Sequence, residues 1–550
     1  MIRKRRTRIM FLHNGMVLSL WWIFIPFFIS AQSTYFVKSG GNGTGHSWAD
    51  ALGNLQQAID SCNEGDQIWI AAGTYYPTYE FDADQSGGSD MRERTFYIKK
   101  NISLYGGFQV GDVQIQDRDL EQNHTVLSGD IGALNDTSDN VYHVMIVDGS
   151  TTDVNINTGC ILDGLHIENG VASGTNWPHA TGSAIFATGA GNGNECSPTL
   201  RFCVFAENYA KYGGTMYNYA MGGICSPHLM HCRFFDNYSY AGAAIFNNAY
   251  GGVCEIEYFN CTFKDNEASY AGGALYNYAN HGICSLQVSN CRFINNTTQI
   301  GGAMYNSSMD GTFYTKIINC IFALNFAHHK GGALFNYGYN GVSQIDAINS
   351  TFHRNTGVHN GGAVRNWYAV ASMINSILWD NGDEIYNTFG SASLQNCLLD
   401  DGSPGNGSIT FNDMVTGVNI IDLDPHFCDA NGSGNLRLKQ ISPAIDMGVI
   451  DTAGLGLMML DLDGYNRFNK TIDLGAYENP FVNCPDSIFL TTAYIPIEGV
   501  YESQRAIQLE EGVSLFTDGI VLNAPNVFFS SHVQIHAGTE VSILQEGCNQ

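Results

Sequence analysis

The feature that most constrains this chain is a repeat with a step of 29 or 30 residues. A Gly-Gly-Ala-type block that ends in Asn, with an aromatic residue before the Asn in every copy but the last, begins at Gly213 and returns five times, the last copy starting at Gly361. A second block, Cys-x-Phe-x-x-Asn, keeps the same step from Cys203 to Cys320 and continues for two further steps with serine in place of cysteine. A fixed period of this size indicates one supersecondary unit stacked many times.

The unit is built from strands rather than helices. Short segments of alternating apolar and polar residues, such as Cys284 to Val288, are separated by glycine and asparagine, and no apolar pattern keeps helical spacing for long. Strands that return in register once per coil form stacked parallel sheets. The sequence therefore predicts an all-β fold, a right-handed parallel β-helix solenoid with an N-terminal cap and a small C-terminal β module.

Stacking at about 4.8 Å per coil would place equivalent residues in ladders. Stacked asparagine amides can hydrogen-bond one another and the turns, so we interpret them as scaffold. Three asparagine series follow the period: Asn218, Asn247, Asn277, Asn306, Asn336 and Asn366; Asn260, Asn290, Asn319, Asn349, Asn375 and Asn396; and Asn208 to Asn381. The repeated cysteines alternate with phenylalanine on the predicted inner face, which favours buried thiols over disulfides, and Cys62, Cys160, Cys428, Cys484 and Cys548 stay unassigned.

The paired Gly-Gly-Ala and Phe-x-x-Asn blocks resemble the repeats of chlamydial polymorphic outer membrane proteins. They are also similar to the wider group of right-handed parallel β-helix proteins with a pectate-lyase-like fold. The resemblance covers about residues 180–400 and implies a fold, not an activity.

The chain begins with the pattern of a secretory signal peptide, residues 1–31. Five basic residues precede an apolar run from Met16 to Ile29, and Ser30-Ala31 is a plausible cleavage site; an uncleaved membrane anchor is the alternative. We expect an N-terminal cap with the first coils over 32–150, including a capping helix near 51–62, and β-helix repeats over 151–440.

The C-terminal part carries further resemblances. Three short segments are similar to the choice-of-anchor region that ends many bacterial β-helix surface proteins: Ile441 to Gly448, Asp461 to Arg467 and Asp473 to Glu478. We therefore interpret residues 441–480 as an anchor-type region. Residues 481–550 alternate apolar and polar residues and look like the small β tail modules of exported Bacteroidetes-type proteins. Residues 480–496 are the expected linker.

Charge narrows the range of partners. The formal net charge is -27, and removing the five basic residues of the signal peptide makes it -32. Nucleic acid and anionic membranes are poor partners for such a surface, and no later stretch is long enough to span a membrane as a helix. We expect a protein that is extracellular or on the outer-membrane surface.

An outward aromatic stripe is the strongest candidate for binding. If Leu275 and Asn277 face inward, strand alternation turns their aromatic neighbours outward, where rings can contact sugars or a partner surface. The opposite register, with the rings filling the core, is the alternative. The predicted binding residues are Tyr217, Tyr219, Tyr276, Tyr278, Tyr305, Tyr337 and Trp367.

Signals for catalysis and metal binding are weaker. His329 and His359 should stack on adjacent coils, with Lys330 and Arg354 near in sequence, and they are candidates for an acid/base site or a solvated turn. The carboxylates of Asp461, Asp463 and Asp473 would suit Ca²⁺ or cap turns, but their spacing is not that of an EF-hand. No other cofactor is indicated.

The sequence favours a non-catalytic role in adhesion or in binding of an extracellular glycan or a neighbouring cell surface. The alternative is an extracellular polysaccharide lyase or glycoside hydrolase on the same fold.

Overall fold

The computed structural model describes residues 32–81, 90–151, 155–400, 415–428, 435–449, 460–467 and 471–479, with short strands between 487 and 544. The predicted signal peptide lies outside the described residues, as do Cys484, Cys548 and most of the predicted linker. In the part of the chain described, no helix is long and apolar enough to cross a membrane.

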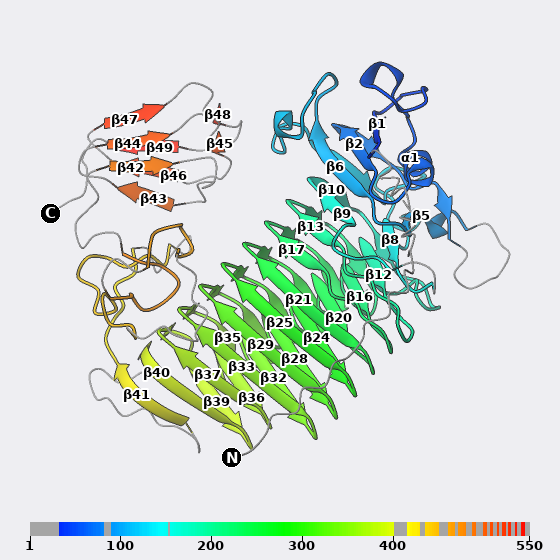
Figure 1. Ribbon diagram of the computed structural model, residues 1–550. Coiled ribbons are helices and arrows are strands. Elements are labelled where there is room, and N and C mark those ends of the chain that lie inside the picture. The colour runs from blue at the N-terminus through cyan, green and yellow to red at the C-terminus, as the bar shows by residue number, and fades with distance from the viewer. Residues whose placement is uncertain are drawn as a thin grey trace, which may run out of the picture. The chain divides into compact units, whose positions relative to one another are not determined.

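The chain is a right-handed parallel β-helix (Figure 1). One coil shows the plan: β24 (Leu275–Asn280), β25 (Ile283–Ser289), β26 (Arg292–Ile294) and β27 (Thr297–Ile300) follow one another, and each pairs in parallel with its equivalent one coil later. The strands stack into three sheets. Sheet I has 23 strands and bends between the β25-type and β26-type strands, sheet II has 11 and sheet III has 7.

The remaining coil strands fall into four groups. The β25-type strands of sheet I, three residues long in the first two coils listed and longer afterwards, are β13 (Thr199–Arg201), β17 (His228–Met230), β21 (Val253–Phe259), β29 (Thr312–Ile318), β33 (Val342–Ile348), β37 (Val370–Ile374), β40 (Ser391–Leu399) and β41 (Val415–Ile421). Its short strands are β10 (Leu165–Glu168), β14 (Val204–Ala206), β18 (Arg233–Phe235), β22 (Thr262–Lys264), β30 (Ile321–Ala323), β34 (Thr351–His353) and β38 (Ile377–Trp379). Sheet II continues with β4 (Tyr79–Glu80), β5 (Arg94–Ile98), β8 (Met145–Asp148), β12 (Ile185–Thr188), β16 (Met216–Tyr219), β20 (Ile245–Asn248), β28 (Met304–Met309), β32 (Leu334–Tyr339), β36 (Val364–Trp367) and β39 (Ile385–Thr388). Sheet III continues with β11 (Val171–Ala172), β15 (Tyr209–Ala210), β19 (Tyr238–Ala241), β23 (Glu267–Ala271), β31 (Phe326–Lys330) and β35 (Thr356–Gly357).

Each corner of the coil is made by a residue in the left-handed backbone region. In this coil these are His281, Asn290, Asn295 and Gly301, with φ of 53°, 54°, 54° and 70°. Asparagine and glycine tolerate that conformation better than other residues, which explains their regular return. Gly302 is required for a second reason, because a Cβ there would collide with the carbonyl oxygen of the next coil.

The inside of the coil holds a ladder of phenylalanine rings and confirms two of the three predicted asparagine ladders. The rings of Phe205, Phe234, Phe263, Phe293, Phe322 and Phe352 are fully buried and stack with centroids 4.3 to 5.1 Å apart. The Asn218 series is joined by amide hydrogen bonds of 2.6 to 2.8 Å and extends to Asn387. The Asn208 series is joined in the same way up to Asn381.

The third asparagine series works differently from the prediction. From Asn260 to Asn396 its members form the corner between the two strand types of sheet I, with φ between 47° and 54°. Their side-chain bonds mostly leave the series: the Nδ2 atoms of Asn319 and Asn396 donate to the carbonyl oxygens of Leu460 and Met447. These residues are scaffold through backbone conformation and docking, not through a continuous amide stack.

The described cysteines inside the stack are buried and unpaired. They are Cys62, Cys160, Cys196, Cys203, Cys225, Cys232, Cys254, Cys261, Cys284, Cys291, Cys320 and Cys397. Burial raises the pKa of Cys62 and Cys397 to about 12. Thiols held protonated in this way act as small apolar side chains rather than nucleophiles.

The N-terminal end is capped as predicted. Helix α1 (Leu55–Ser61) begins at Asn54, whose side chain accepts from the Gln57 amide at 3.2 Å, and buries Leu55, Ala58 and Ile59 in the core. The first coils are formed by β1 (Thr34–Val37), β2 (Gln67–Ala71), β3 (Gly73–Tyr75), β6 (Ser103–Phe108), β7 (Thr125–Ser128) and β9 (Ile161–Asp163), with short 3₁₀ turns at Trp48–Asp50, Met91–Glu93 and Ile115–Asp117. An exposed solenoid end would be an open edge, and α1 covers it.

Residues 423–479 include a segment that packs on the outer face of sheet I. Ile321, Ala323, Ile377 and Leu398 point away from the solenoid core and form a second apolar cluster with this segment. The covering side chains are Phe427, Leu436, Leu438, Ala444, Leu462, Leu474, Ala476 and Tyr477. The Ala476 amide also donates to Thr351 Oγ1 at 3.0 Å, so the segment is fixed to successive coils.

The C-terminal region contains a second small parallel arrangement. Its ladders are β42 (Ser487–Leu490), β44 (Ala506–Leu509) and β47 (Asn526–Phe529); β43 (Gly499–Glu502), β46 (Ile520–Asn523) and β49 (Val541–Leu544); and β45 (Ser514–Leu515) with β48 (Gln534–Ile535). Partners are 19 to 21 residues apart, as in Ser487↔Ala506 and Gly499↔Ile520. The predicted β tail module is thus a solenoid with a shorter coil.

Candidate binding surface

The predicted aromatic stripe lies on the outer face of sheet II, with the expected register. Leu275 and Asn277 are fully buried in the core, and Tyr276 and Tyr278 point outward. Arg365, which pairs with Phe335 at the same register position, also points outward, and its guanidinium lies over the Tyr386 ring at 4.3 Å.

The stripe is less open than predicted. Five outward rings of successive coils pack against one another, with neighbouring centroids 4.5 to 5.3 Å apart. They are the rings of Tyr217, Phe246, Tyr276, Tyr305 and Phe335. Tyr217 is 5% exposed and Tyr305 9%. Because each ring face covers the next, this ladder offers mainly ring edges, which limits stacking against sugars.

A second column on sheet II is half-buried and more varied. Tyr219, Tyr278, Tyr337 and Trp367 occupy it, and Asn248 and Ser307 stand at intervening coils. Tyr337 meets Trp367 edge-on at 5.7 Å. The Lys330 amine lies 5.5 Å from the Trp367 ring, so this predicted catalytic candidate contacts an aromatic face.

Sheet III carries the exposed aromatic residues that the sequence interpretation missed. Tyr209 and Tyr238 stack at 5.5 Å, and Tyr240 and Tyr270 stack at 5.0 Å; all four are 37% to 44% exposed. Their inward neighbours are small, as with Ser239. A signal was present in the sequence: the second residue after Phe-x-x-Asn is small in each copy, as at Ala210, Ser239 and Ala268, so its neighbours can be assigned to the outer face.

His329 and His359 extend this surface along sheet III. Their rings lie 5.4 Å apart, as predicted for adjacent coils, and the His359 amide donates to the His329 carbonyl oxygen at 2.7 Å. Both side chains are exposed. No carboxylate hydrogen-bonds to either ring among the described residues. Arg354 belongs to a corner of sheet I and donates to Asp380 at 2.8 Å, so the four candidates do not form one site.

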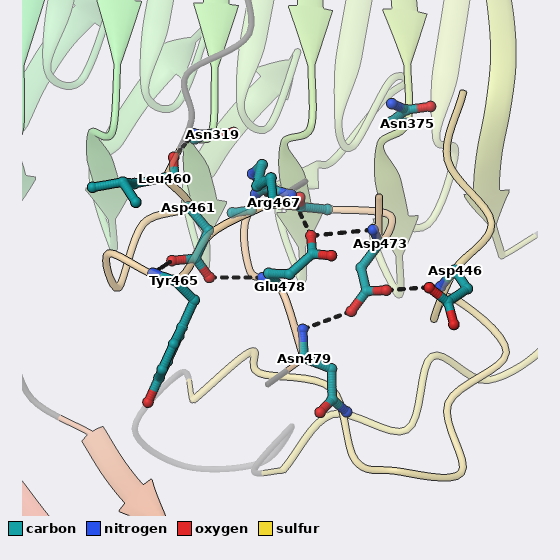
Figure 2. A network of polar contacts seen from close by, with 12 residues as sticks. Asn319, Asn375, Asp446, Leu460, Asp461, Tyr465, Arg467, Asp473, Glu478 and Asn479 are labelled. Atoms are coloured by element: carbon teal, nitrogen blue, oxygen red, sulfur yellow. Dashed lines mark hydrogen bonds and ion pairs between the residues drawn. The ribbon is translucent and has the colours of Figure 1, made fainter. Parts of the chain in front are cut away.

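The predicted metal candidates lie in the segment docked on sheet I, and their carboxylates serve as turn-capping groups. Figure 2 shows Asp461 accepting the amides of Tyr465 and Glu478, both at 2.7 Å, and Asp473 accepting those of Asp446 and Asn479. Asp463 pairs with Arg437 through bonds of 2.5 and 2.8 Å. Among the described residues, no group of three or more His, Cys, Asp or Glu side chains is arranged to hold a metal ion.

The same network encloses a buried arginine. Arg467 is fully buried, donates to the Gly475 carbonyl oxygen at 3.0 Å and pairs with Glu478 at 3.4 Å. Burial raises the pKa of Asp461 to about 7, that of Asp473 to about 6 and that of Glu478 to about 8, and the positive charge of Arg467 opposes these shifts. The network is a structural clasp within the segment that docks on sheet I.

A titratable cluster on the early coils was not foreseen. The rings of His124 and His166 stack with centroids 4.4 Å apart. The pKa of His166 is lowered to about 4, mainly by burial and to a smaller extent by the charges of His124 and Arg233. Glu168 points outward from the same strand as His166. Its pKa is raised mainly by burial and to a smaller extent by the negative charge of Glu207.

Two arginines support this face from the neighbouring strands. Arg118 and Arg201 both pair with the buried Asp163 at 2.8 Å. The members come from distant loops and strands, so no local motif could have indicated them.

Comparison with known proteins found one family of repeats and several solved structures similar to this chain. The model of the Chlamydia polymorphic membrane protein repeat matches residues 260–278, and no curated protein matches the chain. A crystal structure of pectate lyase Pel9A is similar at 13% identity, covering 82% of this chain and 97% of that chain, with a TM-score of 0.44. The PL6 family alginate lyase AlyGC is similar at 11% identity over 93% and 71%, with a TM-score of 0.28. The chain is a β-helix repeat protein whose repeats are similar to the Chlamydia repeat.

Proposed function

We propose that this protein is secreted or displayed on the cell surface, where it binds a glycan or a partner surface without catalysing a reaction. The observation that carries this proposal is the row of exposed rings on sheet III, Tyr209, Tyr238, Tyr240 and Tyr270, held on a rigid sheet. Rigid aromatic side chains supply contact area with little loss of conformational freedom on binding.

The rows of rings suit a carbohydrate for a chemical reason. Pyranose rings present C–H faces to aromatic rings and hydroxyls to polar groups, and the rings and hydroxyls of the sheet III tyrosines provide these two kinds of contact. The outward side chains beside them include Glu267 and Thr297 rather than a positive patch, which favours a ligand without strong negative charge.

The test is a glycan-binding screen with the mature chain, followed by the double variant Tyr240→Ala, Tyr270→Ala. We expect binding that the double variant weakens without a change in thermal unfolding. The double variant Tyr276→Ala, Tyr278→Ala tests the predicted stripe on sheet II in the same way. Absence of binding to any glycan or cell surface would reject the proposal.

A second candidate function, polysaccharide lyase or glycoside hydrolase, is favoured by the cluster of His124, His166 and Glu168. Burial raises the pKa of Glu168 and lowers that of His166 on the same strand, and a carboxyl group and an imidazole shifted in this way are suited to general acid–base catalysis. Incubation with acidic and neutral glycans, with and without Ca²⁺, tests it. Unsaturated products that absorb in the ultraviolet, or new reducing ends, both lost in Glu168→Gln, would establish the enzyme.

A further inference from the structure

One strand of sheet III carries shorter outward side chains than the strands on either side of it. β27 presents Thr297 and Gln299 outward, and the strands on either side present larger groups, among them Tyr270 on β23 and His329 on β31. Both ladders shift register along these strands, and the pairs after the shift place Gln299 between them: Ile300 pairs with Ala271 on one side and with Lys330 on the other. A gap in the aromatic row therefore lies at the coil of β27.

The width of this gap follows from the stacking of coils. Strands two coils apart are separated by about 9.6 Å, twice the spacing between neighbouring strands. A ring inserted midway would lie about 4.8 Å from the planes of Tyr270 and His329, within the range in which ring faces make favourable contact.

The two faces that border the gap are available. Tyr270 stacks on Tyr240 of the preceding coil, and His329 on His359 of the following coil. Among the described residues, neither ring has a ring partner on the side of Gln299. The Gln299 amide likewise makes no hydrogen bond in the part of the chain described, so its donors and acceptor can serve a ligand.

The equivalent position on sheet II makes a useful contrast. Ser307 also stands between two aromatic residues, Tyr278 and Tyr337. It is only 2% exposed, so its neighbours close over it. The gap at Gln299 is half-open, which points to a single ring-binding subsite on sheet III.

We infer that Tyr270, Gln299 and His329 form a subsite that sandwiches one pyranose ring of a neutral glycan chain. The inference rests on the proposed glycan-binding function and adds the position and the class of sugar. Neutral sugar is favoured because Glu267 is exposed on the adjoining strand and the chain carries a net charge of -27. Lys330, the cation on the same strand as His329, contacts Trp367 instead.

The deciding experiment is isothermal titration calorimetry of the mature protein with cellohexaose, mannohexaose, xylohexaose and laminarihexaose, with hexagalacturonate as the acidic counterpart. In Gln299→Tyr a new ring should fill the gap and continue the stack. We expect affinity for the neutral ligand to fall by about tenfold or more, the loss of one good contact. Thr356→Tyr, which adds the same ring at an exposed position on β35, is the matched control and should leave the affinity unchanged.

Each outcome has a defined meaning. Unchanged affinity in Gln299→Tyr overturns the subsite but leaves the proposed function intact, as does binding of hexagalacturonate alone. Equal loss in the control variant also overturns the subsite, because the effect would then not depend on position. If the wild-type chain binds no glycan, both the subsite and glycan binding are rejected. Thermal unfolding of each variant confirms that the stack is intact.

Discussion

The outer face of the short strands of sheet I differs between the middle and the late coils. In β18 and β22 it carries Arg233, Thr262 and Lys264, which are partly or fully exposed. In β30 and β38 the same register positions hold Ile321 and Ile377, which are buried under the C-terminal segment. The inner face hardly changes over the same coils, because phenylalanine recurs there from Phe205 to Phe352.

The comparison separates two kinds of constraint. Inward positions must fit the ring above and the ring below, so the period returns the same residue type. Outward positions can hold varied polar residues where they face solvent, and they hold apolar residues where another segment of the chain packs on them. Functional differences between coils should therefore be sought on the outside.

The largest effect should come from the contrast between inner and outer positions of a single strand. Phe234 is fully buried in the phenylalanine ladder and its neighbour Phe235 is half-exposed. Phe234→Ala should lower the free energy of unfolding by about 4 kcal/mol through cavity formation, and Phe235→Ala by less than about 1 kcal/mol. Denaturant unfolding measures both, and equal losses would contradict the assignment of faces.

The next effect tests the covered against the uncovered outer face. Ile377→Asp places a carboxylate under the docked segment and should cost about 3 kcal/mol, whereas Thr262→Asp at the same register should cost less than about 0.5 kcal/mol. Limited proteolysis of residues 423–479 reports the docking directly. Faster cleavage is expected only in Ile377→Asp, and protection in both variants would argue against the cover.

A smaller effect should distinguish the asparagine ladder from an outward asparagine. Asn247 donates to Asn277 and Tyr258 and accepts from Asn218, all inside the core. Asn247→Ala leaves buried partners unsatisfied and should cost about 2 kcal/mol, and Asn248→Ala, one residue further and outward, about half of that. Reversed sizes in thermal or denaturant unfolding would refute the ladder as a stabilising element.

The smallest effect is a pH dependence of the clasp at Arg467. The folded protein holds protons on Asp461, Asp473 and Glu478 to a higher pH than the unfolded chain does, because burial raises their pKa values to about 7, 6 and 8. Their contribution to the folded form of the docked segment is therefore complete below about pH 4 and is lost as pH rises to about 8. The charge of Arg467 offsets part of this loss.

Limited proteolysis at pH 5, 7 and 8.5, corrected for protease activity, measures this dependence. Cleavage of residues 423–479 should accelerate with pH, and Glu478→Gln should flatten the upper part of the profile. A segment that docks more tightly at pH 8.5 than at pH 5 would contradict the sign.

Much of the solenoid could be predicted from the residues alone. The 29- or 30-residue step, the alternation around Cys284 and the return of Asn and Phe already require stacked parallel strands, because only repeated register accounts for them. The stacking of His329 on His359 also follows from the period. Alternation allowed two registers for Leu275 and Asn277, and the structure shows the one in which both face inward.

Only the tertiary structure decided what happens on the outside of the coil. On sheet II the aromatic rings stack on one another, whereas Tyr240 and Tyr270 on sheet III stay exposed to solvent. The carboxylates of Asp461 and Asp473 accept hydrogen bonds from backbone amides. The physical reason is that the period specifies which residues share a ladder, whereas exposure depends on how rings lean and on which distant segment returns to cover them. What the sequence by itself determined is the scaffold, and the arrangement in space decided which of its faces stays available for binding.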